Sequence, residues 1–260
     1  MSQSNFQSGF SEVNGLNMYY EIYGEGKPLV LIHGGGSTIQ TTYGNIIPLL
    51  SKQRQIIAMD LQAHGRSGDR TTDLSFEQDA DDVVMLLNNL KISKTDFLGY
   101  SNGGHTLIEI ALRHPSLINK IIIASSFYKR EATVPEFWEG FEHATIDVMP
   151  QSLKDGFLKV NNNEKALLNM FRKDVQKMKT FKGWTEEQIK SITAPALIVN
   201  GNNDVGSIEH AVEMHRVMKD SQLLILPGKH GVYIGAIEYL DDKPWTQSYF
   251  ADIVNNFLDE

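Results

Sequence analysis

The chain contains no cysteine among its 260 residues, which excludes disulfide bonds, thiolate metal sites and a cysteine nucleophile. It also lacks an excess of positive charge. The formal net charge is −8, spread along the chain, and nucleic-acid phosphates would be repelled by it. No run approaches the ~20 apolar residues that a membrane span requires, and the first residues lack the pattern of a secretory signal. We therefore expect a cytoplasmic protein that binds neither nucleic acid nor membrane.

The length and composition indicate one globular domain with a full core. A hydrophobic fraction of 41% is ordinary for such a domain, and 260 residues fit a single α/β unit. Short continuous apolar runs predict strands that are buried on both faces. These runs lie at residues 29–32, 55–60, 120–125, 195–200 and 222–226. Helical periodicity between them predicts a mostly parallel, doubly wound sheet, with an antiparallel hairpin turning at Asn14-Gly15.

One long segment breaks this alternation of strands and helices. Residues 126–190 contain no buried-strand run and are rich in Phe, Trp, Met and charge. Their apolar side chains need a surface to pack against. We predict a helical insertion over the carboxyl ends of the strands, called the cap insertion below, and a core made of about residues 1–125 and 191–260.

The pattern Gly-Tyr-Ser-Asn-Gly at residues 99–103 follows an apolar strand and precedes a helix that reaches about Arg113. This is G-x-S-x-G in a strand-turn-helix context, the pattern of a nucleophile elbow. So sharp a turn forces a strained backbone on Ser101 and exposes its hydroxyl, and the flanking glycines allow close backbone approach. On its own the pattern also fits a glycine-rich turn with a helix-capping serine.

Three further polar stretches follow predicted strands, at residues 33–36, 201–204 and 228–231. Functional groups of open α/β sheets collect just beyond the carboxyl ends of the strands. The chain order Ser101, Asp204, His230 is the nucleophile, acid and base order of this architecture. A serine hydroxyl needs a base within hydrogen-bond reach, and an aspartate fixes the tautomer of that histidine.

Acyl transfer at a serine also needs donors for the oxyanion that forms. The backbone N–H groups of Gly35 and Asn102 are the candidates, since Asn102 would begin a helix whose unpaired N–H groups favour negative charge. No stretch resembles a phosphate-binding loop or a zinc site. We therefore predict neither a cofactor nor a metal.

Other residues compete for the acid and base roles. Asp147 or Glu131 of the cap insertion could replace Asp204, and His143 could line the pocket. His210 lies in a polar helical stretch and is predicted to be solvated. His105, one turn after Ser101, is predicted to pack rather than to act as the base.

The chain resembles the α/β-hydrolase fold superfamily over nearly its whole length. Besides the elbow, residues 60–67 resemble the family stretch D-x-x-G-H-G-x-S, with Ala63 where glycine is usual, and His33-Gly34 resembles the oxyanion-loop motif. The resemblance implies that Ser101 is the nucleophile, Asp204 the acid and His230 the base. It assigns the oxyanion hole to the loop after residue 33 and the elbow, and pocket shaping to the cap insertion.

We therefore expect a carboxylesterase-like serine hydrolase that cleaves a small ester, thioester or lactone through an acyl-enzyme on Ser101. The same triad would also serve a carbon–carbon bond hydrolase, with which Ser37 and Thr38 are compatible, or a cofactor-free perhydrolase. A ligand-binding receptor would not need all three residues. The serine at the elbow disfavours a haloalkane dehalogenase, which needs a carboxylate nucleophile. The sequence leaves open the acyl substrate, the pocket-lining cap residues and the choice between monomer and homo-oligomer.

Overall fold

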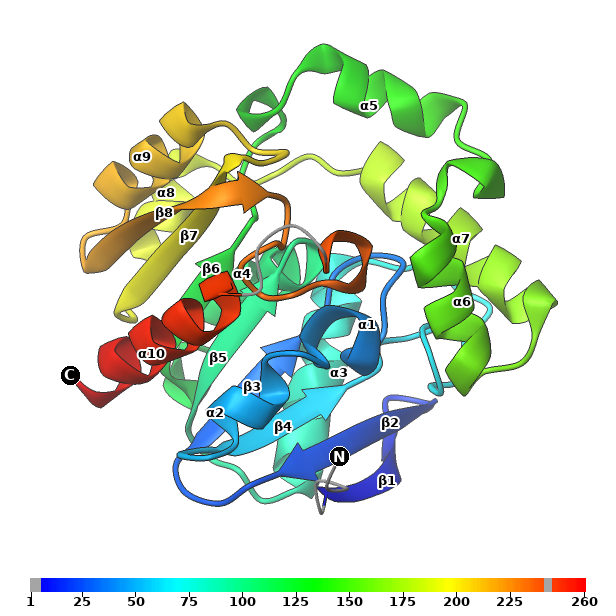
Figure 1. Ribbon diagram of the computed structural model, residues 1–260, viewed down its shortest axis with the longest axis horizontal. Helices are drawn as coiled ribbons and strands as arrows, with labels where there is room; N and C mark the ends of the chain where they lie inside the picture. Colours follow the sequence, from blue (N-terminus) through cyan, green and yellow to red (C-terminus); the bar gives the residue numbers. More distant parts are fainter. Residues whose placement is uncertain (1–5, 241–244) are drawn as a thin grey trace.

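The computed structural model describes residues 6–240 and 245–260. Its centre is an eight-stranded sheet of order β1-β2-β4-β3-β5-β6-β7-β8. Strands β3 to β8 are parallel, while β2 pairs antiparallel with both β1 and β4. The mostly parallel sheet predicted from the apolar runs is confirmed (Figure 1). The strands are β1 (Phe6–Val13), β2 (Leu16–Tyr23), β3 (Pro28–Ile32), β4 (Gln55–Met59), β5 (Thr95–Tyr100), β6 (Ile118–Ala124), β7 (Ala196–Asn203) and β8 (Ser221–Lys229).

The predicted hairpin at the start of the sheet is present. Val13 pairs with Leu16, so the turn has two residues, Asn14 and Gly15. Both have positive φ, 48° and 77°, which is the backbone that a tight turn between twisted strands requires.

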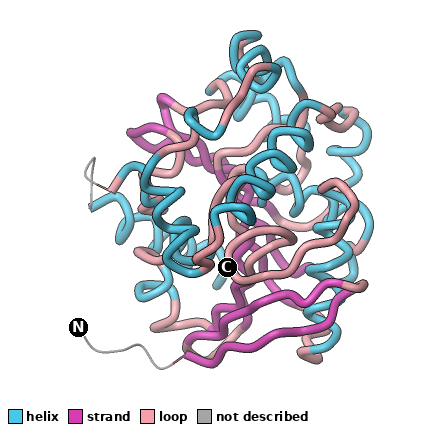
Figure 2. Tube along the Cα trace, turned by 90° about the vertical axis from the view of Figure 1, so that its right-hand side faces the viewer, coloured by secondary structure: helices cyan, strands magenta, loops and turns pink. Residues whose placement is uncertain are grey.

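Helices cover both faces of the sheet, as Figure 2 shows with strands in magenta and helices in cyan. Alternate residues of each buried strand point to opposite faces: Val30 and Ile32 join one hydrophobic cluster, and Leu29 and Leu31 join the other. The first cluster includes side chains of α3 (Phe76–Asn89), α4 (Asn102–Arg113), α8 (Glu186–Ser191) and α9 (Ile208–Val217). The second includes side chains of α1 (Ile39–Tyr43), α2 (Ile47–Leu50) and α10 (Trp245–Asp259). None of the described helices combines the length and apolar character needed to cross a membrane.

Between β6 and β7 the chain, all of it described, forms helices and loops without a strand. The helices are α5 (Pro135–Glu142), α6 (Gln151–Val160), α7 (Glu164–Lys179) and α8. Figure 1 shows α5 along the top of the molecule and α6 and α7 at its right-hand side. By contrast, α8 contacts α4 and α9 and contributes Ile189 to the core beneath the sheet. Short 3-10 turns lie at Pro115–Leu117, Arg130–Ala132, Ile146–Val148 and Ile237–Tyr239.

Candidate active site

The turn between β5 and α4 holds Ser101 in a strained backbone conformation. Its φ is 53° and its ψ is −123°, outside the regions that residues with a side chain normally occupy. The helix that follows packs close against β3, because a β-carbon added at Gly103 would lie 2.0 Å from the Ile32 carbonyl oxygen. The tight glycine contact and the strained serine are the geometry expected of a nucleophile elbow.

The ends of the adjacent strands β7 and β8 bring Asp204 and His230 together. Asp204 Oδ1 lies 2.6 Å from His230 Nδ1, and the aspartate side chain has no exposed surface. The backbone N–H groups of Gly201 and Val205 also donate to this carboxylate, each at 2.8 Å. Burial alone would raise the pKa of Asp204, but the adjacent His230 ring and these hydrogen bonds hold that pKa below its usual range. The carboxylate is therefore ionised and can orient the histidine ring.

A cavity of about 290 Å³ opens beside these residues. Ser101 and His230 both line it, while no hydrogen bond joins the two side chains in the described structure. Such contacts commonly tighten only when substrate binds. The rest of the wall is mainly apolar, with the aromatic rings of Phe127, Phe137, Phe141 and Phe171. The arrangement places the candidate nucleophile and base at one hydrophobic pocket.

The two predicted oxyanion donors belong to neighbouring residues of the cavity wall. Gly35 and Asn102 both line it, and a β-carbon added at Gly35 would lie 2.5 Å from Asn102 Nδ2. Across the described residues, neither backbone N–H has a hydrogen-bond partner. Asn102 is the first residue of α4, where the helix dipole favours negative charge. Both backbone N–H groups therefore remain without a partner among the described residues, on residues that line the same cavity as Ser101.

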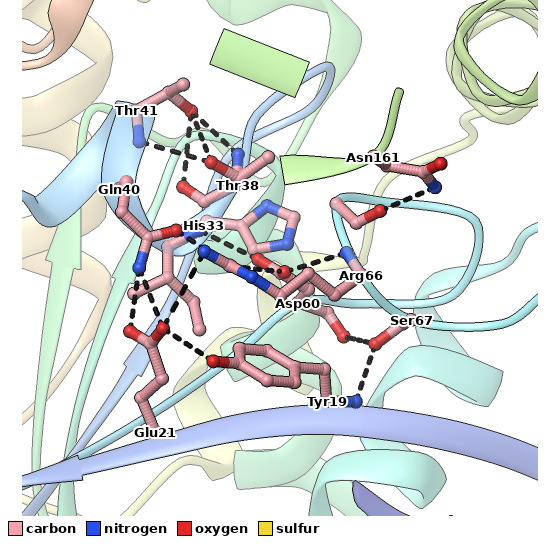
Figure 3. A network of polar contacts seen from close by, with 12 residues as sticks. Tyr19, Glu21, His33, Thr38, Gln40, Thr41, Asp60, Arg66, Ser67 and Asn161 are labelled. Atoms are coloured by element: carbon pink, nitrogen blue, oxygen red, sulfur yellow. Dashed lines mark hydrogen bonds and ion pairs between the residues drawn. The ribbon is translucent and has the colours of Figure 1, made fainter. Parts of the chain in front are cut away.

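The loop that carries Gly35 is held by a buried polar network (Figure 3). Leu61 N–H donates to His33 Nε2 at 3.0 Å, and Ile39 N–H donates to Asp60 Oδ1 at 2.9 Å. Arg66 N–H donates to the other oxygen of Asp60 at 3.0 Å. Residues 60–67 thus support the loop that carries Gly35.

The backbone conformation of Ala63 explains why glycine is usual at this position in the family. Its φ is 64°, in the left-handed region that disfavours a β-carbon. The methyl group compensates in part, since it is buried in a cluster with Met149, Leu153 and Phe157 of the cap insertion.

Asp174 of α7 is a polar cavity residue that sequence reasoning missed. Its Oδ2 accepts from the Gly36 N–H at 2.5 Å and lies 2.8 Å from His64 Nε2. Lys177 Nζ lies 3.6 Å from the other oxygen and 2.9 Å from Asp79 Oδ2. In sequence, Asp174 and Lys177 are two charges one turn apart on an amphipathic helix, a pattern that normally indicates a solvated face.

The buried charges of this network shift each other's pKa. Burial alone would raise the pKa of Asp174, but His64 and Lys177 outweigh it and hold that pKa well below the usual range. Burial would lower the pKa of His64, and the Asp174 carboxylate raises it above 6.5 instead. Among the described residues no group of three or more His, Asp or Glu side chains is arranged to hold a metal ion.

The competing acids and bases lie elsewhere. Asp147, Glu131 and His143 are exposed and do not line the cavity. The prediction that His210 is solvated is wrong: the side chain is 3% exposed and accepts a hydrogen bond from the Tyr128 N–H, because that face of α9 packs against the core. His105 packs among aromatic rings at the cavity wall, where burial lowers its pKa to about 3.

Comparisons with known proteins identify the family of the chain. A family model described as alpha/beta hydrolase fold matches residues 27–146. Serine hydrolase BPHL of Homo sapiens is 31% identical, over 85% of this chain and 79% of BPHL. The 2-hydroxy-6-oxo-6-(2'-aminophenyl)hexa-2,4-dienoic acid hydrolase of Metapseudomonas resinovorans is 25% identical, over 99% of this chain and 92% of that protein.

A solved structure extends the comparison to the fold. The crystal structure of a serine hydrolase involved in carbazole degradation, the CarC enzyme, superposes with a TM-score of 0.78. It is 22% identical, and the alignment covers 98% of this chain and 99% of that one, which shows the shared fold. On this evidence the chain belongs to the α/β-hydrolase fold family and is a hydrolase.

Proposed function

We propose that the protein is a serine hydrolase that cleaves small esters, thioesters or lactones through an acyl-enzyme on Ser101. One observation carries the proposal: the strained Ser101 lines the same cavity as His230, whose ring is hydrogen-bonded to the buried Asp204. This is the set of roles that acyl transfer by a serine requires.

In the proposed reaction, His230 Nε2 removes the hydroxyl proton of Ser101 as Oγ attacks the substrate carbonyl carbon. The carbonyl oxygen becomes an oxyanion that accepts hydrogen bonds from the N–H groups of Gly35 and Asn102. The imidazolium returns the proton to the leaving oxygen or sulfur as its bond to the carbonyl carbon breaks. Water, deprotonated by His230, then attacks the acyl carbon, and the imidazolium returns this proton to Ser101 Oγ as the acyl–Oγ bond breaks and the acid leaves.

The cavity favours a small, largely apolar acyl compound. About 290 Å³ is at the lower end of the volumes of small-molecule sites, and four phenylalanine rings form much of its wall. The name of the human relative, a serine hydrolase, supports the same class of nucleophile.

The test is hydrolysis of a series of p-nitrophenyl esters of increasing acyl length. We expect Ser101→Ala to abolish turnover with little change in melting temperature, and the rate to fall once the acyl chain outgrows the cavity. Reaction of wild type, but not of Ser101→Ala, with a fluorophosphonate would independently identify the nucleophile. Retained esterase activity in Ser101→Ala would overturn the proposal.

A second candidate is a carbon–carbon bond hydrolase with the same triad. The substrate in the name of the Metapseudomonas relative is a 2-hydroxy-6-oxo dienoic acid with an aryl ketone and no ester, so its hydrolysis has to break a carbon–carbon bond. Aromatic cavity walls suit an aryl group. Loss of the absorbance of such a dienoate, with no turnover of the ester series, would favour this function over the first.

A further inference from the structure

Beyond the hydrogen bonds described above, the Asp204 carboxylate has a further partner just after the end of β6, the strand beside β7. Ser125 directly follows β6, and its Oγ lies 2.5 Å from Asp204 Oδ2. The same Oγ lies 2.7 Å from the hydroxyl of Tyr233, three residues after His230. Ser125 and Tyr233 are 3% and 1% exposed, so neither contact competes with bulk water.

The direction of these hydrogen bonds follows from the chemistry of the groups. An ionised carboxylate can only accept, so Ser125 donates its single proton to Asp204. Ser125 Oγ therefore accepts from Tyr233, whose hydroxyl stays protonated because burial and the charge of Asp204 raise its pKa well above 10. The result is a directed chain from Tyr233 to Ser125 to Asp204, in which each bond polarises the next.

The backbone conformation of Ser125 supports a functional role for its hydroxyl group. Its φ is 51°, in the left-handed region that disfavours residues with a β-carbon, yet the position is not glycine. Its N–H donates to the Val199 carbonyl at 2.8 Å, so β7 holds the strained residue in place. A glycine would relieve the strain but would remove the hydroxyl that reaches Asp204.

We propose that Ser125 and Tyr233 form a hydroxyl relay that positions the Asp204 carboxylate for His230. The inference rests on the proposed function of the triad and adds two positioning residues to it. Tyr233 and His230 lie on one loop and hold the two oxygens of the carboxylate, one through Ser125 and one directly. Together with the N–H groups of Gly201 and Val205, the relay therefore holds the rotation of the carboxylate, and it also ties the loop that carries His230 to the end of β6.

Kinetics of single variants give the first test. Ser125→Ala keeps the β-carbon and the positive φ but removes the donor, and we expect kcat to fall roughly 10-fold or more with KM little changed, because a hydrogen bond to a charged group is lost. Without that donor the carboxylate attracts the imidazolium proton more strongly. The acid limb of the kcat/KM profile should then move to higher pH.

Other titratable side chains lie close to His230, and none of these variants changes them. The ring of Tyr100 lies 4.9 Å from that of His230, and the charge of Glu238 acts on both rings. A shifted acid limb in Ser125→Ala therefore reports the relay and not these groups.

The double variant distinguishes a relay from two separate structural roles. Tyr233→Phe keeps the ring packed at 4.9 Å from Phe250 and removes only the outer hydroxyl. We expect a several-fold loss of kcat in the wild type and none in the Ser125→Ala background. Tyr128→Phe is the matched control, since it deletes a buried hydroxyl bonded to Glu213 away from the triad, and should leave kcat unchanged. Additive losses, or an equal loss in the control, would overturn the proposal.

Two readouts do not depend on the substrate. Ser125→Gly should raise the melting temperature above that of Ser125→Ala through relief of strain. The NMR resonance of the His230 Nδ1 proton should shift in Ser125→Ala and less in Tyr233→Phe. An unshifted resonance would overturn the relay. A shifted resonance in an enzyme that hydrolyses no ester would leave the relay standing and remove the proposed function.

Discussion

The two halves of the candidate site are built from different parts of the molecule. The acid–base half, Asp204 with His230 and Ser125, stands on the ends of three neighbouring strands. The oxyanion half, Gly35 and Gly36 with Asp174, is a loop of the core held by a side chain from the cap insertion. The sheet alone fixes one half, whereas the other is shared between the sheet and a helix more than 130 residues further along the chain. If the proposed roles hold, substitutions in one half should leave the structure of the other half unchanged.

The largest expected effect is the loss of kcat in Asp204→Asn, a change in the acid–base half. The same Asp-to-Asn change at Asp174 is the matching test of the other half. Asp204→Asn removes the charge that orients His230 while keeping the shape, and should lower kcat by about 10⁴-fold with the fold intact. Ester kinetics and a thermal melt would check this. Unchanged kcat would mean that another group holds the base.

Asp174→Asn should reduce the stability of the fold strongly and kcat only modestly. It leaves Lys177 and His64 with less compensating charge in a buried site, so we expect a loss of about 3 kcal/mol in the free energy of unfolding. The fall in kcat should be about tenfold, since the Gly36 N–H keeps a weaker acceptor. Urea unfolding and ester kinetics measure both quantities, and Asp155→Asn at an exposed carboxylate is the control. A loss of kcat equal to that of Asp204→Asn would contradict the separation of the two halves.

A smaller effect should appear in the pH dependence of the free energy of unfolding, to which His64 contributes through its contact with Asp174. The folded-state pKa of His64 is raised above 6.5, so its contribution to stability is fully present below that pH. The contribution is lost as pH rises through the higher folded-state value. We expect the free energy of unfolding to decline across that range in wild type, and the decline to shrink in His64→Gln but not in His143→Gln. Equal slopes in wild type and His64→Gln would refute the assignment.

The smallest expected effect is that of Ala63→Gly. Relief of the left-handed φ should stabilise the fold by about 1 kcal/mol, and loss of the buried methyl should cost about 0.8 kcal/mol. The net change in the free energy of unfolding should therefore be within about 0.5 kcal/mol of zero. A loss above about 2 kcal/mol would show that the methyl contact with the cap insertion dominates.

Sequence patterns predicted the sheet and the strand-end motifs because both are local. Buried parallel strands read as apolar runs, and the elbow is five consecutive residues. Ser125, Tyr233 and Asp174 could not be found in this way, since each reaches its partner across 79 or more residues and belongs to no motif. The prediction that His210 is solvated fails for a related reason. A polar helical stretch in the sequence does not reveal which of its turns packs against Tyr128.

The hydrogen bond from the Gly36 N–H to Asp174 has a consequence for engineering. Exchange of residues 126–190 for the insertion of another family member looks like a change of specificity alone. In this protein the exchange also removes the acceptor of Gly36 and the charge partner of His64. A chimera would therefore keep Ser101, Asp204 and His230 but lose the support of the loop that carries Gly35 and Gly36, unless the new insertion brings a carboxylate to the same place.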